Sequence, residues 1–322
     1  MRFLFVAISE PLPGIKWRRV FDRHWHAYSR WFLRGGIQER ASYLDGFRAI
    51  KKYMPELAKP YEQICEAAGD GDLEARFLSM WCPPAYVGGC SQVVRSGKNP
   101  ILARNYDYSP ELFEGTWLNS RLTGKGVIAV VDCLWGALDG INEDGLAVSL
   151  AFGGRRDVGE GFGIPIVLRY VLECAGNVKE AIAILRRVPV HMSYSVALVD
   201  KGGDAALVYL NPDRPAEVAN RLFTTNHQHG VTWPRHAAAT KSVEREAALQ
   251  ASLPRLGSGK EVVVLLQKPP LYQNSYARGY GTLYTALYRP ENGSVELFWP
   301  GRNWRQSFDN WVDDELPIEI EV

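Results

Sequence analysis

The residue pattern of this chain changes at Cys90, and this change limits the folds that the chain can adopt. Before Cys90, apolar residues recur at helical spacing within 38–57 and 60–68, and Pro55 and Pro60 stand where a helix can begin. After Cys90, short β-branched or leucine-rich runs are separated by Gly, Asn or Asp, a pattern typical of strands. We therefore expect a helical N-terminal segment followed by a domain that contains both helices and strands.

The expected elements after Cys90 alternate between groups of strands and helices. Pro165 fits the first turn of one helix, and Asn177 with Glu180 forms a capping pair for the next. A further helix is expected over 235–252. Strands are expected at 93–94, 101–102, 127–131, 146–150, 194–200, 205–210, 221–225, 261–266, 281–288 and 294–299. This order alone predicts a mixed α and β domain.

Cys90 follows two glycines, Gly88 and Gly89, and this position suits a nucleophile that cleaves its own chain. Glycine lets the backbone adopt conformations closed to other residues, which a peptide bond needs if the next side chain is to attack it. Cleavage between Gly89 and Cys90 would give Cys90 an α-amine with a pKa of about 7.7–8.0, much nearer neutrality than that of lysine. The amine could then serve as general base for the thiol of the same residue, without a separate histidine.

Several segments, taken with Cys90, make this chain resemble the N-terminal-nucleophile (Ntn) hydrolases. The segments, in chain order, are ARNYDY (103–108), DGINEDGL (139–146), the helical stretch from Gly163 to Ala181, and TTNH (224–227). Arg104 and Asp107 follow Cys90 by 14 and 17 residues. The chain is most similar to the penicillin acyltransferase-like proteins (the acyl-CoA:6-aminopenicillanate acyltransferase family), which are related to choloylglycine hydrolase and acid ceramidase. The resemblance covers most of the chain.

The resemblance implies an α+β fold, the four-layer αββα sandwich of the Ntn hydrolases, with a helical N-terminal propeptide segment. Residues 1–89 would form the propeptide or small subunit, which stays bound after cleavage of the precursor. Residues 90–305 would form the catalytic domain. Residues 306–322 are rich in acidic side chains and would form a C-terminal tail or an edge strand.

The resemblance also implies roles for four residues in an amidase or acyltransferase reaction. Cys90 would attack an amide or thioester carbonyl, and Asp107 would hold and orient the new α-amine. Arg104 would stabilise the thiolate, because a nearby cation favours the charged form. Asn226 would donate its side-chain amide to the oxyanion, with a backbone N–H within 150–154 as the second donor.

Four further residues are weaker candidates for contact with the substrate: Tyr108, Asn142, Phe152 and Arg278. Tyr108 and Phe152 belong to a group of aromatic residues near the motifs that indicates an apolar acyl pocket. Asn142 is better explained as a residue whose side chain stabilises the turn in which it stands. Either Arg278 or Arg245 could be an arginine of the C-terminal half of the chain that reaches the site. Arg245 fits a surface charge on a helix equally well.

The sequence leaves two other functions open. In the first, Cys90 pairs with His227 or His236 in a Cys–His hydrolase that does not process itself. In the second, the chain is a non-catalytic binding protein on the same fold. His227 and His229 do not predict a metal site, because no third ligand follows at a suitable spacing, so we expect neither metal nor cofactor.

Charge, hydropathy and cysteine content exclude several classes of partner. A net charge of +1 gives no field that would favour nucleic acid. No apolar run reaches the ~18 residues of a membrane span, and the apolar stretch in 1–9 is too short for a signal peptide. Five cysteines at irregular spacing argue against a disulfide framework and favour a reducing, cytoplasmic compartment. The expected partner is a small-molecule acyl amide or thioester, and assembly into a homo-oligomer is left open.

Overall fold

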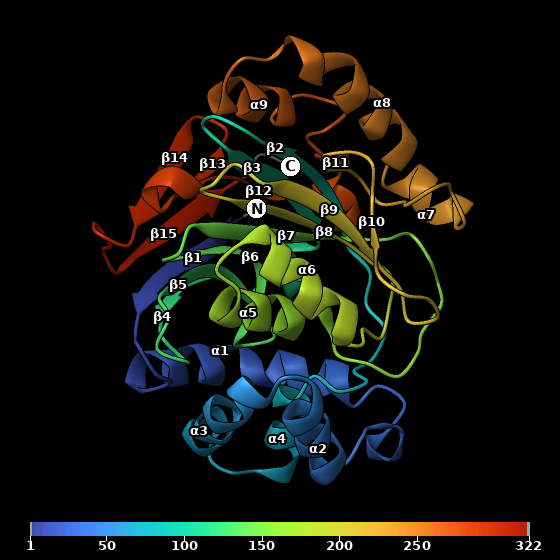
Figure 1. The fold of residues 1–322 in the computed structure, drawn as a ribbon. Coiled ribbons are helices and arrows are strands. Elements are labelled where there is room, and N and C mark those ends of the chain that lie inside the picture. The colour runs from blue at the N-terminus through green and yellow to red at the C-terminus, as the bar shows by residue number, and fades with distance from the viewer. Residues whose placement is uncertain (1, 321–322) are drawn as a thin grey trace.

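Two packed β-sheets form the centre of the computed structural model, which describes residues 2–320 (Figure 1). The larger sheet has the order β10 (Glu217–Val218), β9 (Ala205–Leu210), β8 (Tyr194–Asp200), β7 (Leu146–Phe152), β6 (Gly136–Asn142), β5 (Val127–Asp132), β4 (Thr116–Ser120), β1 (Arg2–Ser9) and β15 (Asp314–Glu319). The smaller sheet has the order β11 (Phe223–Thr224), β2 (Gly89–Arg95), β3 (Ile101–Tyr108), β12 (Gly281–Arg289), β13 (Ser294–Trp299) and β14 (Arg302–Ser307).

Helices cover the outer face of each sheet. The larger sheet carries α5 (Ile164–Cys174) and α6 (Val178–Arg187), and the smaller sheet carries α7 (Pro234–Ala239), α8 (Ser242–Ser252) and α9 (Gly259–Leu266) (Figure 1). Short 3₁₀ helices are η1 (Ile37–Glu39), η2 (Pro55–Leu57), η3 (Pro110–Leu112), η4 (Leu253–Arg255), η5 (Tyr276–Arg278) and η6 (Pro290–Asn292). The predicted α+β fold of four layers is confirmed.

The N-terminal helices form a further layer beyond α5 (Figure 1). They are α1 (Ile15–Phe32), α2 (Tyr43–Tyr53), α3 (Ala58–Ala68) and α4 (Asp72–Leu78). Helix α1 buries Trp17, Phe21 and Phe32 on one face, while its basic residues lie on the other. Helix α1 is therefore amphipathic. No helix within residues 2–320 is both long and apolar enough to cross a membrane.

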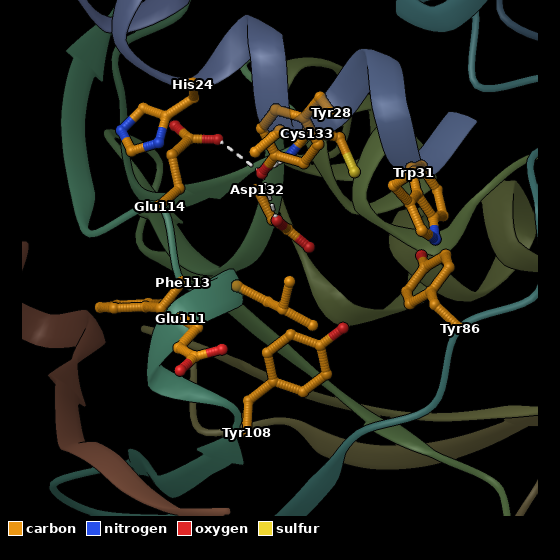
Figure 2. A pocket seen from close by; sticks show the side chains of 12 residues that line it. His24, Tyr28, Trp31, Tyr86, Tyr108, Glu111, Phe113, Glu114, Asp132 and Cys133 are labelled. Atoms are coloured by element: carbon orange, nitrogen blue, oxygen red, sulfur yellow. Dashed lines mark hydrogen bonds between the residues drawn. The ribbon is translucent and has the colours of Figure 1, made fainter. Parts of the chain in front are cut away.

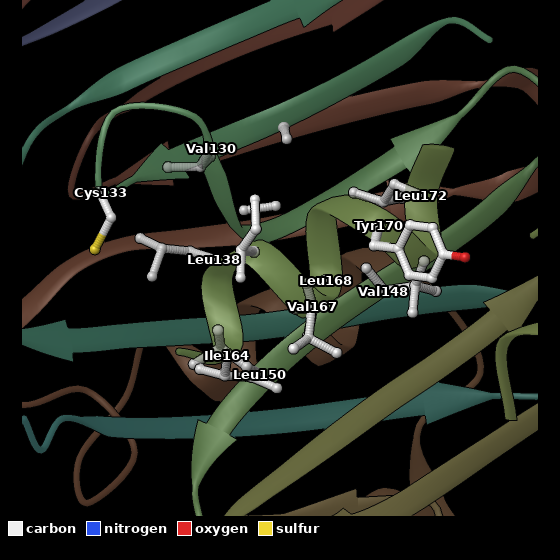
Figure 3. Close-up of a cluster of buried hydrophobic side chains, with 14 of the residues drawn as sticks. Val130, Cys133, Leu138, Val148, Leu150, Ile164, Val167, Leu168, Tyr170 and Leu172 are labelled. Atoms are coloured by element: carbon white, nitrogen blue, oxygen red, sulfur yellow. The ribbon is translucent and has the colours of Figure 1, made fainter. Parts of the chain in front are cut away.

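The larger sheet is covered on both faces, so its central strands are almost entirely buried. Leu138 and Val148 of this sheet belong to the same buried cluster as Leu168 and Leu172 of α5 (Figure 3). Strands buried on both faces read as nearly continuous apolar runs, which is why the sequence predicted β5, β7, β8 and β9 well. The buried sheets provide a rigid support for the ends of β2 and β3.

One predicted strand is wrong: residues 261–266 belong to helix α9. Ser258 accepts a hydrogen bond from the Glu261 backbone N–H, and the Glu261 carboxylate returns to the Ser258 backbone N–H, which completes a capping box. Val262 and Leu266 stand four residues apart and are buried against the sheet. A short β-branched run cannot be assigned to strand or helix by its pattern alone, and here the cap decides.

Two further expectations differ from the structure. The single helix expected over 235–252 is two helices, α7 and α8, because Lys241 adopts a left-handed backbone conformation between them. The sequence predicted no strand in residues 2–9, which form β1. This strand pairs in parallel with β4 and antiparallel with β15, so both ends of the described chain lie in the larger sheet.

A buried histidine makes folding stability depend on pH. His191 is fully buried, and burial lowers its pKa to about 4. The unfolded chain therefore binds the proton first as pH falls below about 6.5, and stability is lost between about pH 6.5 and pH 4. Between pH 7 and pH 5 this group removes about 2 kcal/mol from the free energy of unfolding. Urea unfolding should show that this part of the pH dependence disappears in His191→Gln; equal slopes in both proteins would contradict the assignment.

Candidate active site

Cys90 lies at the start of β2 and is 1% exposed. Its Sγ accepts a hydrogen bond from Nη2 of Arg104, on the neighbouring strand β3, at 2.8 Å. Burial raises the pKa of the Cys90 thiol, and the Arg104 guanidinium opposes this effect. In the uncut chain the sulfur is therefore a protonated thiol at neutral pH, held beside a fixed cation.

Arg104 is itself fixed by a buried carboxylate. Its Nη1 lies 2.6 Å from Oδ2 of Asp139 and donates to the Leu138 carbonyl at 2.9 Å. Asp139 also accepts hydrogen bonds from the hydroxyls of Tyr284, at 2.5 Å, and Tyr288. These contacts satisfy a carboxylate that is 0% exposed, and they leave Nη2 of Arg104 directed at the sulfur.

Asn226 follows β11 and faces the backbone nitrogen of Cys90. Its Oδ1 accepts hydrogen bonds from the Cys90 N–H at 3.0 Å and from Nη2 of Arg245 at 2.5 Å. Its Nδ2 donates to the Phe152 carbonyl at 3.2 Å. The predicted oxyanion donor therefore lies at the Cys90 backbone, beside the stretch 150–154 that was expected to supply the second donor.

Arg245 connects the remaining groups of the site. It is fully buried on α8, and its Nη1 donates to the Cys90 carbonyl at 2.7 Å and to Oγ of Ser91 at 2.9 Å. The same Nη1 lies 3.2 Å from Oδ2 of Asp107, whose Oδ1 accepts a hydrogen bond from Thr282 at 2.7 Å. Burial raises the pKa of the Asp107 carboxyl, and Arg245 opposes it. Asp107 is thus linked to Cys90 through Arg245 in the uncut chain.

Of the two arginines from the C-terminal half of the chain, Arg245 lies at the candidate site and Arg278 does not. Arg278 is exposed in η5, whereas the expectation of a surface charge at Arg245 does not hold, because its guanidinium is enclosed by site residues. Arg278 was the candidate named from the sequence, and the structure does not support that choice. Asp139, Tyr284 and Ser242 were not predicted as site residues; Asp139 alone stood within a quoted motif.

The other three candidate residues, Phe152, Tyr108 and Asn142, contact different parts of the structure. Phe152 offers its carbonyl to Asn226, as described, and its ring contacts the ring of His236. Tyr108 is half-buried and borders a cavity beneath α1. Asn142 serves its turn: Oδ1 accepts from the Leu146 N–H, and Nδ2 donates to two carbonyls at the end of α5.

The histidines contact other partners than the Cys90 sulfur. His227 places Nδ1 2.7 Å from Oγ of Ser242 and Nε2 2.5 Å from the Glu246 carboxylate. Ser242 Oγ also accepts a hydrogen bond from the Asn226 backbone N–H, so this chain of contacts positions Asn226. Burial lowers the pKa of His236 to about 4. Within residues 2–320, no group of three or more His, Cys, Asp or Glu side chains is arranged to hold a metal ion.

The two packed sheets with helices on both outer faces are the fold of the Ntn hydrolases. A model of the family described as acyl-coenzyme A:6-aminopenicillanic acid acyl-transferase matches residues 94–304. The chain belongs to this family. The matched range begins shortly after Cys90 and includes Arg104, Asp107, Asn226 and Arg245.

Solved structures of three hydrolases are similar to parts of this chain. A mutant of the conjugated bile acid hydrolase from Clostridium perfringens has 12% identity and a TM-score of 0.48, over 72% of this chain and 97% of that chain. The N-acylethanolamine-hydrolyzing acid amidase ortholog of Caenorhabditis elegans has 16% identity and a TM-score of 0.47, over 63% and 93%. Penicillin V acylase from Agrobacterium tumefaciens has 15% identity and a TM-score of 0.43, over 68% and 86%. A search of curated proteins found no match.

Proposed function

We propose that this protein is a self-processing cysteine amidase or acyltransferase that cleaves or transfers the acyl group of a small-molecule amide or thioester. The observation that supports this proposal most directly is the arrangement around Cys90. Its thiol contacts Arg104, its N–H contacts Asn226, and its carbonyl contacts Arg245. The thiol, the backbone N–H and the backbone carbonyl of Cys90 are thus each held by a buried polar side chain.

In the proposed self-cleavage, the Cys90 sulfur attacks the Gly89 carbonyl carbon. The Gly89–Cys90 C–N bond breaks as the nitrogen takes up the thiol proton, and Gly89 is left as a thioester on Sγ. Water then hydrolyses the thioester, which gives a Gly89 carboxylate, the free thiol and an α-amine on Cys90. The contact between Asn226 Oδ1 and the Cys90 nitrogen would hold that nitrogen in place while it changes from amide to amine.

In the proposed turnover, the Cys90 α-amine takes the thiol proton and the sulfur attacks the substrate carbonyl. An Asn side chain has two N–H donors, and the contact with Phe152 uses one of those on Asn226. The second would hold the tetrahedral oxyanion together with a backbone N–H within 150–154. The protonated amine gives its proton to the leaving group, and water or an amine resolves the thioester acyl-enzyme.

The packing of the N-terminal segment supports retention of residues 1–89 as a bound propeptide after cleavage. Strand β1 would stay paired with β4 and β15, and α1 would keep its aromatic face buried. We propose residues 90–305 as the catalytic domain. The acidic segment proposed at 306–322 includes the end of β14 and the edge strand β15.

Trapping of the acyl-enzyme tests the proposed activity. The protein is mixed with a panel of N-acyl amides and acyl thioesters, quenched in acid and analysed by mass spectrometry. The account predicts that the fragment beginning at Cys90 gains the mass of the acyl group, and that peptide mapping places the addition on Cys90. Turnover without such an adduct, or an adduct on another residue, would contradict it.

Gly89 has a steric reason to be glycine, and its replacement should slow self-cleavage. A Cβ on Gly89 would lie 1.6 Å from the Tyr280 hydroxyl oxygen, whereas a Cβ on Gly88 would meet its nearest neighbour, Tyr108, at 3.5 Å. Gly89→Ala should therefore displace the scissile bond and slow cleavage at least about tenfold, while Gly88→Ala serves as the matched control. The rate is measured by denaturing electrophoresis after synthesis of the chain in vitro. Equal rates for both variants would refute the steric argument.

A further inference from the structure

A cavity of about 80 Å³ lies beneath α1, between this helix and the loop after β3 (Figure 2). Its walls include the aromatic side chains of Tyr28, Trp31, Tyr86, Tyr108 and Phe113. Three carboxylic acids also line it, Glu111, Glu114 and Asp132, and no lysine or arginine is among its lining residues. A cavity with aromatic side chains and an excess of carboxyl groups in its walls favours a ligand that carries positive charge.

Two of these carboxyls compete for one hydroxyl. The Tyr28 Oη lies 3.0 Å from Oε2 of Glu114 and 2.8 Å from Oδ1 of Asp132, and it accepts a hydrogen bond from the Cys133 N–H (Figure 2). A phenol has one proton, so it can donate to only one of the two carboxyls. Glu114 is 5% exposed, and its Oε1 has no hydrogen-bond partner among residues 2–320. The Leu134 N–H also donates to Oε2 of Glu114 at 3.0 Å, so the acceptor left without a partner in the described chain is Oε1.

Other buried carboxylates in the described chain are compensated. Asp107, Asp139 and Glu173 each pair with an arginine, and Asp200 accepts hydrogen bonds from three backbone N–H groups. Glu114 and Asp132 form no ion pair within residues 2–320. His24 borders the cavity, but burial lowers its pKa to about 4, so it is neutral at pH 7 and supplies no cation. A buried carboxylate such as that of Glu114 is costly to leave without a cationic partner.

The pKa values of the two carboxyls agree with this excess of negative charge. Burial, and after it the neighbouring Glu114, raise the pKa of Asp132 to about 7. Burial also raises the pKa of Glu114, opposed by the Leu134 N–H and by the hydroxyls of Tyr28 and Thr116. A bound cation would lower both values, because an opposite charge favours the ionised form.

We propose that this cavity binds an organic cation, a protonated amine or a quaternary ammonium group, between the carboxyls of Glu114 and Asp132 and the surrounding aromatic rings. The faces of Tyr and Trp rings attract cations, so the aromatic walls would contribute directly to the binding of the cation. A metal ion fits less well, because no group of three or more metal-ligating side chains is arranged for one in the described chain.

A series of aromatic contacts connects the cavity to the surroundings of Cys90, and the assignment of the cavity to part of the substrate rests on the function proposed above. Tyr108 borders the cavity and packs against Gly88, two residues before Cys90. The Tyr108 ring lies 5.7 Å from that of Tyr106, which in turn lies 5.0 Å from the Arg104 guanidinium carbon. The cation would then belong to the amine-bearing part of the acyl donor or of the acyl acceptor.

Calorimetric titration with choline and with its neutral isostere 3,3-dimethylbutan-1-ol tests the proposal. The two probes share their shape and differ in charge. The full chain, as wild type and as Cys90→Ala, should bind choline at least about tenfold more tightly than the isostere. Asp132→Asn should weaken choline binding at least about tenfold. Glu244→Gln, the same kind of change at an exposed residue of α8, should leave it unchanged.

Equal binding of the two probes, or full choline binding by a folded Asp132→Asn, would overturn the proposal. So would binding of Zn²⁺ that excludes choline. The comparison of the two probes on the wild type remains decisive if Asp132→Asn fails to fold. Binding is non-covalent and is measured on Cys90→Ala as well, so failure of the cavity proposal and failure of the Cys90 chemistry give different results.

Discussion

Cys90→Ala is expected to yield a single uncut chain without amidase or acyltransferase activity. The sulfur is the attacking atom both in self-cleavage and in turnover, and no other thiol contacts Arg104 in the described chain. Loss of the nucleophile should lower turnover by at least about 10³-fold, since only binding and oxyanion stabilisation would remain. Both effects are measured on one preparation, the cleavage by mass spectrometry and the turnover with the substrate identified by acyl trapping.

Cys65→Ala is the matched control for this experiment. Cys65 is a buried cysteine of α3, and burial raises the pKa of its thiol to about 12, so it behaves as a small apolar residue. The account predicts normal cleavage and turnover for Cys65→Ala. A Cys90→Ala chain that still splits between Gly89 and residue 90, or still turns over substrate, would remove Cys90 from both proposed reactions.

Asn226→Ala should have the second largest effect. The variant loses the acceptor that holds the Cys90 nitrogen and the donor proposed for the oxyanion. Loss of one oxyanion donor lowers kcat by about 10²–10³-fold, which is about 2.7–4 kcal/mol of transition-state stabilisation. Self-cleavage should slow as well, so turnover is measured on the fraction that has been cut.

Asn142→Ala separates this effect from a loss of stability. Asn142 is also buried and hydrogen-bonded, but its contacts hold the turn at Leu146 and the end of α5. Its replacement should destabilise the fold by about 1–3 kcal/mol and leave kcat of the folded protein nearly unchanged. If both variants lose kcat to the same extent, Asn226 has no special role in the reaction.

The site residues that stand close to one another in the sequence could be predicted from the sequence. Cys90, Arg104 and Asp107 belong to two strands joined by a short turn, and the register of β2 and β3 places Asp107 opposite Gly89 and Arg104 opposite Gln92, both within two residues of Cys90. Arg245 could not be found in this way. It stands on a helix between Glu244 and Glu246, a pattern that fits an exposed charged face, and only the packing of α8 on the smaller sheet buries it.

Strands β1 and β14 escaped prediction for different reasons. Strand β1 is stabilised by β4 and β15, which lie more than 100 and 300 residues away along the chain. Strand β14 is largely polar and lies at the edge of the smaller sheet, so it has no apolar alternation to reveal it. Central strands such as β8 and β9 carry their own apolar runs, and their bounds were predicted correctly.

Intact mass under denaturing conditions tests the central claim most directly. Freshly purified wild-type protein is unfolded, which separates the proposed propeptide from the catalytic domain, and the mixture is weighed by mass spectrometry. The account predicts two fragments whose masses correspond to residues 1–89 and to the chain that begins at Cys90. A single species of 36.1 kDa that persists on prolonged incubation would contradict self-processing, and would favour the Cys–His hydrolase or the non-catalytic binding protein instead.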